Sequence, residues 1–70
     1  MTEFKSVTTG EIITSKNNTN SVSRGDYIEV SKKNKSIKGK VLRVSHVIEV
    51  WYNAEGKERD LHDIIIEIKE

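Results

Sequence analysis

A chain of 70 residues can form at most one independent hydrophobic core, because a domain of this size buries only about 60% of its unfolded surface. Only 34% of the residues are hydrophobic and none is cysteine, which excludes disulfides, thiolate metal sites and a cysteine nucleophile. The apolar run Ile64–Ile66 is far shorter than the roughly 20 residues that cross a bilayer. The composition therefore predicts one cytoplasmic domain with no membrane association.

The net charge of +1 conceals a segregation of the two signs along the chain. Residues 24–46 carry seven basic and two acidic side chains, a net charge of +5, whereas residues 47–70 carry three basic and seven acidic side chains, a net charge of −4. Residues 1–23 balance to zero. This pattern predicts a dipolar molecule with a basic side that an acidic ligand could occupy.

The first 22 residues are predicted to form a polar, partly disordered leader. Within this leader, Glu11–Thr14 has the apolar content to add an edge strand near Ile12. Residues 15–23 are mostly serine, threonine, asparagine and lysine, so this stretch is expected to be mobile. The folded domain is then expected to span residues 23–70.

Alternation of apolar and polar residues predicts strands over the rest of the chain, and no stretch has helical apolar spacing over ten or more residues. Asn53–Lys57 is the clearest hairpin turn, since asparagine and glycine tolerate the positive φ angles that such turns require. Further turns are expected near Ser45–Val47 and at His62–Asp63. The predicted strands are residues 27–30, 40–46, 47–52, 58–61 and 64–69.

Five short antiparallel strands separated by turns favour an all-β fold that closes into a small barrel. The alternation also predicts which side chains point inward. The expected core residues are Ile28, Val30, Val41, Val44, Ile48, Val50, Leu61, Ile64, Ile66 and Ile68.

Two segments carry a resemblance to known domains. Arg24–Val30, followed by a basic loop and Lys38–Val44, resembles the KOW motif of ribosomal proteins and elongation factors, in which Gly-Asp opens a strand and Gly-x-Val closes a basic loop. Trp51–Lys57 and Asp60–Ile64 resemble the second half of Tudor-type SH3-like barrels. The resemblance implies an SH3-like barrel over residues 24–70, a fold that carries many unrelated binding roles.

Groups suited to catalysis or metal binding are few. His46 and His62 are the only histidines, and no serine lies in a nucleophile motif. Their spacing matches no zinc or calcium site, and the four glycines are isolated rather than gathered in a phosphate loop. We therefore expect no enzyme activity, no metal and no cofactor.

The lysine-rich loop is the feature with the most direct chemical complement, because lysines neutralise phosphates. Tyr27 and Trp51 are out of phase with the inward-facing residues and could stack on bases if they face outward on neighbouring strands. Nucleic acid, RNA or DNA, is accordingly the first expected ligand. The candidate binding residues are Lys32, Lys33, Lys35, Lys38, Lys40, Arg43, Tyr27 and Trp51.

A protein partner is the alternative. The acidic C-terminal half, or an apolar strip around Tyr27 and Trp51, could dock on protein, since exposed aromatic side chains commonly anchor such interfaces. The small size and composition suit a viral or mobile-element accessory protein that modulates a host complex. Segregated charge also permits a homo-oligomer.

Overall fold

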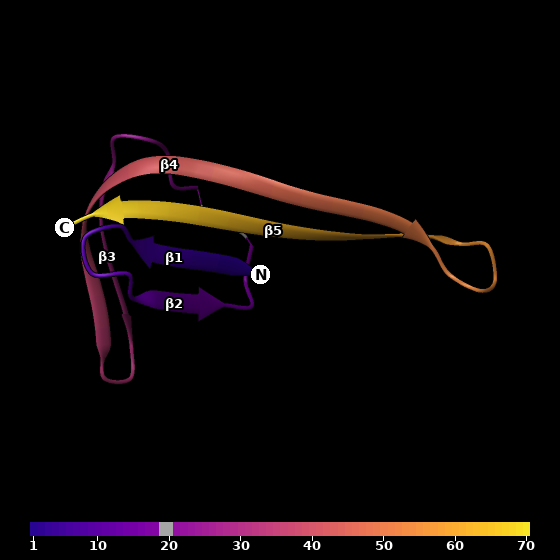
Figure 1. Cartoon of the computed structure of the whole chain (residues 1–70), viewed down its shortest axis with the longest axis horizontal. Coiled ribbons are helices and arrows are strands. Elements are labelled where there is room, and N and C mark those ends of the chain that lie inside the picture. Colours follow the sequence, from indigo (N-terminus) through magenta and orange to yellow (C-terminus); the bar gives the residue numbers. More distant parts are fainter. Residues whose placement is uncertain (19–20) are drawn as a thin grey trace.

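The computed structural model describes residues 1–18 and 21–70, which form a single five-stranded sheet (Figure 1). The order across the sheet is β2-β1-β5-β4-β3. Strands β1 and β5 run parallel, and the other neighbours are antiparallel. The prediction of an all-β protein is confirmed. The strands are β1 Thr2–Ser6, β2 Ile12–Ser15, β3 Tyr27–Lys32, β4 Lys35–Tyr52 and β5 Glu58–Lys69.

The predicted closed antiparallel barrel is wrong, because the sheet is mixed and open. Strands β2 and β3 are its two edges, and they pair only with β1 and β4 respectively. The sheet curls enough for the side chain of Lys32 to donate a 2.8 Å hydrogen bond to the backbone carbonyl of Thr14. That bond joins the two edges without a backbone ladder between them.

The N-terminal residues contribute more to the sheet than the leader prediction implies. The edge strand expected near Ile12 is β2, while β1 lies inside the sheet against β5, with Phe4 opposite Ile66. Phe4 and Ile13 are both in the core. The mobility predicted for residues 15–23 falls partly on residues 19 and 20, which lie outside the described residues.

The turn predicted near Ser45–Val47 is wrong, and so is the turn at His62–Asp63, because β4 and β5 each run through unbroken. The two segments predicted to turn contain no glycine or proline. They pair with each other, with Val47 opposite Asp63. The irregularity lies earlier, in a β-bulge between Val41 and Arg43, where the extra residue bends the strand.

The hairpin turn between β4 and β5 is confirmed. The side-chain oxygen of Asn53 accepts hydrogen bonds from the backbone amides of Glu55 and Lys57, each at 3.0 Å. Gly56 has φ +78°, a left-handed conformation that glycine adopts without a steric cost.

The hydrophobic core lies where all the strands overlap, and not along the whole of β4 and β5. Of the predicted core, Val41, Ile64, Ile66 and Ile68 are buried, and Ile28, Val30 and Val44 pack against them while partly buried. Phe4, Ile13 and Ile37 complete the buried cluster and were not predicted. The predictions for Ile48, Val50 and Leu61 are wrong, because these side chains are exposed beyond the last strand that could cover them.

Candidate functional site

The far halves of β4 and β5 form a two-stranded hairpin that projects from the rest of the sheet (Figure 1). We call residues 46–63 the arm and the remaining residues the body. Strand β3 pairs with β4 only up to Lys40, and β1 pairs with β5 only from Ile64 onward, so no strand among residues 1–18 and 21–70 pairs with either edge of the arm. Among the described residues, no third strand therefore stabilises the arm by hydrogen bonding or packing.

Large apolar side chains are exposed on both faces of the arm. On an antiparallel pair, residues directly opposite each other share a face. Val47, Leu61 and Trp51 accordingly lie on one face, and Ile48, Val50 and Tyr52 lie on the other. Their exposed fractions run from 41% for Trp51 to 69% for Tyr52. A two-stranded hairpin is only marginally stable alone in water, so these residues form a surface suited to contact with another molecule.

Polar contacts join the two strands at the base of the arm and connect that base to the body. The Nδ1 atom of His46 and the Nε2 atom of His62 are 2.8 Å apart, which links β4 to β5. The backbone carbonyl of His62 accepts a hydrogen bond from the Asn18 amide, and the N-terminal ammonium lies 3.5 Å from Asp63. The arm therefore leaves the body in a defined direction.

The dimensions of the molecule show how far the arm departs from a globular shape. The Cα radius of gyration is 14.2 Å, whereas a compact chain of this length would have about 11 Å. The accessible surface is 5261 Å², and a compact monomer of this mass would expose about 4,450 Å². The excess of roughly 800 Å² is close to the area that one partner contributes to a standard protein interface.

The basic residues predicted to form one patch are divided between two places. Lys32, Lys33 and Lys35 lie at the β3–β4 turn and face β2 across the open side of the sheet. Lys38 and Lys40 lie on the outer face of β4 with Arg43, opposite Glu29, Tyr27 and Glu67 in register. The structure therefore does not bring the whole predicted set together.

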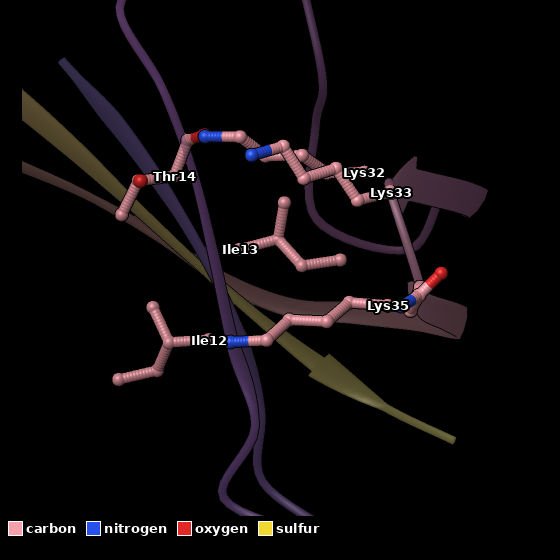
Figure 2. Close-up of a pocket in the computed structure, with 7 residues that line it drawn as sticks. Ile12, Ile13, Thr14, Lys32, Lys33 and Lys35 are labelled. Carbon is pink, nitrogen blue, oxygen red and sulfur yellow. The ribbon is translucent and has the colours of Figure 1, made fainter.

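We call the opening between β2 and β3 the seam, and it is hollow. Two adjoining cavities of about 340 and 470 Å³ share Ile13, Thr14 and Lys32 in their walls. Apolar side chains form the floor, and lysines form the rim. Figure 2 shows Lys32 and Lys33 reaching toward Thr14 while Lys35 reaches toward Ile12, with Ile13 between them. The residues of the seam are Phe4, Ile12, Ile13, Thr14, Ser15, Lys16, Val30, Ser31, Lys32, Lys33, Asn34 and Lys35.

The outer face carries the second basic group. Tyr27 is 69% exposed and lies directly opposite Lys40, which in turn lies opposite Lys69. A hollow of about 480 Å³ beside them is lined by Arg24, Gly25, Lys40, Val41, Leu42 and Lys69. Three cationic side chains therefore border a hollow with an exposed aromatic ring next to it.

Tyr27 and Trp51 do not act on the same ligand segment, because they lie at opposite ends of the molecule. Tyr27 pairs with Lys40, and Trp51 follows eleven residues later on β4, a path of roughly 36 Å at about 3.3 Å per residue. Trp51 belongs to the arm and Tyr27 to the outer face of the body. The expectation that they would lie on neighbouring strands was based on the turn at Ser45–Val47, which the chain does not make.

The body and the arm have net charges of opposite sign. The body contains ten basic and six acidic side chains, a net charge of +4, and the arm contains two basic and five acidic side chains, a net charge of −3. Because the arm projects along the longest dimension, 45 Å, the charges are separated in space as well as in sequence. The predicted dipole is present.

Within residues 1–18 and 21–70, no group of three or more histidine, cysteine, aspartate or glutamate side chains is placed to hold a metal ion. The same residues contain no helix long and apolar enough to cross a membrane. No family model, no curated protein and no solved structure matches the chain.

Proposed function

We propose that this chain is a non-enzymatic protein-binding module whose arm is covered by a protein surface. The observation that carries the proposal is the set of large apolar side chains exposed on both faces of a hairpin that pairs with no third strand in the part of the chain that the structure describes. Covering such residues removes apolar area from water and supplies the packing that a lone hairpin lacks. Aromatic residues near the end of the arm, Trp51 and Tyr52, are of the type that anchors protein interfaces.

Trp51 provides an internal reporter of this interaction, since it is the only tryptophan of the chain and belongs to the arm. Its fluorescence emission should shift to shorter wavelength when protein covers the arm, because the indole ring leaves water. A double variant, Ile48→Asp with Val50→Asp, places two charges on one face of the arm and should abolish partner binding. The variant should keep its fold, because neither side chain belongs to the core.

The test is affinity capture from extracts of the source cells with the parent protein and with this variant. The matched control is Val7→Asp with Leu42→Asp, which changes two exposed apolar residues of the body. Proteins captured by the parent and the control but lost with the arm variant would support the proposal, and reconstitution with the purified candidate should shift the Trp51 emission. Capture that is the same for all three proteins would contradict it.

Nucleic-acid binding is the second candidate function, supported by the outer face of the body. Arg24, Lys40 and Lys69 border the 480 Å³ hollow next to exposed Tyr27. Phosphate groups would fit between the cations, and the tyrosine ring would offer a stacking surface to a base.

Fluorescence anisotropy with labelled single- and double-stranded DNA and RNA over a salt series tests this second function. Lys40→Ala with Lys69→Ala should weaken binding and reduce its dependence on salt, because two phosphate contacts are lost. Lys33→Ala with Lys35→Ala removes the same charge from the seam and serves as the control. Equal weakening by both variants would indicate attraction to net charge alone, and no binding by the parent at low salt would exclude the function.

A further inference from the structure

We propose that the arm of one copy docks in the seam of a second copy, so that two chains form a closed dimer with two equivalent interfaces. This inference builds on the protein-binding role of the arm and names its partner as the same chain. It starts from two separate surfaces of one molecule: the acidic arm with its exposed apolar side chains, and the seam with its apolar floor and lysine rim.

Charge is the first complement. The arm has a net charge of −3, and Glu58 and Asp60 share a face near its tip, with Arg59 on the opposite face and Glu55 and Lys57 in the turn. The rim of the seam contains Lys16, Lys32, Lys33 and Lys35 and no acidic side chain. Opposite potentials steer two surfaces together and fix their relative orientation, whereas like charges directed against each other are costly.

Apolar surface is the second complement. The floor of the seam is built from Phe4, Ile13 and Val30, and the two cavities of about 340 and 470 Å³ have the size of sites that accept large side chains. The arm offers Val50, Trp51 and Tyr52 immediately before its tip. An aromatic side chain entering the seam would bury apolar area on both molecules.

The solvent-accessible surface area of the chain agrees with formation of a dimer. The chain exposes roughly 800 Å² more than a compact monomer of its mass would, which is about one partner's share of a standard interface. A molecule that gives its arm and receives its partner's arm would cover this excess. Such an exchange closes on itself and leaves no free arm for further growth.

Two other arrangements are less favoured. Arm-to-arm pairing would bring together two hairpins that each carry a net charge of −3, and like charges facing each other oppose association. Docking of the arm on the outer face would also join opposite charges. That face, however, presents Glu29 and Glu67 among its basic residues, whereas the seam rim is basic throughout.

Sedimentation velocity over a concentration series tests the proposal with the full chain. The parent should pass from the 8.0 kDa monomer to a dimer of twice that mass, with a blue shift of the Trp51 emission over the same concentration range. A seam variant, Lys33→Glu with Lys35→Glu, and an arm variant, Glu58→Lys with Asp60→Lys, should each remain monomeric at concentrations where the parent is a dimer. An equimolar mixture of the two should recover a heterodimer, because each altered surface then meets one of opposite charge.

The matched control is Lys38→Glu with Lys40→Glu, which makes the same charge change on the outer face and should leave the dimer intact. Dimerisation of the seam variant by itself, in the absence of the arm variant, would show that the seam is not the receiving surface and overturn the proposal. Loss of the dimer in the outer-face control alone would move the receiving surface to that face and also overturn it. A parent that stays monomeric at all concentrations would overturn self-association but leave the protein-binding role intact, since capture of a different partner tests that role separately.

Discussion

Single residues in this sheet have consequences that follow from backbone geometry rather than from side-chain contacts. Gly39 lies on β4 opposite Ile28, where the end of β5 passes close by. A Cβ atom at this position would overlap the carbonyl oxygen of Lys69 and lie 2.7 Å from its carbonyl carbon and 2.9 Å from the Cα of Glu70. All three atoms are backbone, so none can move aside by changing a rotamer.

Gly39→Ala should therefore destabilise the protein by about 1 to 3 kcal/mol, the cost of forcing a backbone shift in a packed region. The free energy of unfolding from urea titration measures this loss. Gly10→Ala is the comparison, because Gly10 has φ +79° but nothing within 4 Å of an added Cβ, so its cost arises from backbone conformation alone. A Gly39→Ala protein as stable as the parent would show that β4 and β5 separate more easily than the close approach indicates.

The hydrogen bond from Lys32 to Thr14 shows why residue-level roles were hard to infer from sequence. From the sequence, a lysine in a polar turn is interpreted as a solvated or phosphate-binding group. The residues next to Lys32 in the sequence do not indicate that its side chain binds a backbone carbonyl eighteen residues earlier. The bond exists because β1 and β2 lie on the other side of β5 and curl toward β3. The assignment of Lys32 depends on topology, which local pattern does not specify.

At the scale of elements, alternation predicted where strands occur but not where they end. The inward phase was right for Val41, Ile64, Ile66 and Ile68, since these residues lie under the other strands. After the β-bulge the inward phase passes to Val44 and continues to Ile48 and Val50, which are exposed because no strand covers that part of β4. An alternation of period 2 shows that successive side chains point to opposite faces of a strand. Burial additionally requires another part of the protein to cover one of those faces. The parallel pairing of β1 with β5 joins opposite ends of the chain and left no local signal.

The arm should be removable without unfolding the body, because it contributes none of the buried core residues. Replacing residues 48–62 with Asn-Gly would close the hairpin between Val47 and Asp63, which are opposite each other in register, by a favoured two-residue turn. Thermal and urea unfolding should remain cooperative, with a midpoint close to that of the parent. Loss of the cooperative transition would mean that the arm supplies stability that its exposed side chains do not reveal.

The separation of the arm from the body, in shape and in charge, should affect the attraction of polyanions to the body. The arm carries a net charge of −3 and the body +4, and the two lie along a 45 Å axis. The outer part of the arm, from Val47 to Tyr52, extends roughly 20 Å at about 3.3 Å per residue. This length exceeds the Debye length of about 8 Å at physiological ionic strength but not the length of about 30 Å at 10 mM.

Removal of residues 48–62 should therefore strengthen the binding of a labelled single-stranded DNA to the body at 10 mM salt and leave it nearly unchanged at 150 mM. At low salt the acidic arm repels the strand across the length of the molecule, whereas at physiological salt the intervening ions screen that repulsion. Anisotropy titrations of the parent and the armless protein at both salt concentrations measure the difference. An equal gain in affinity at the two concentrations would contradict this prediction, because it would mean that an arm blocks the basic residues by contact and does not act through long-range repulsion.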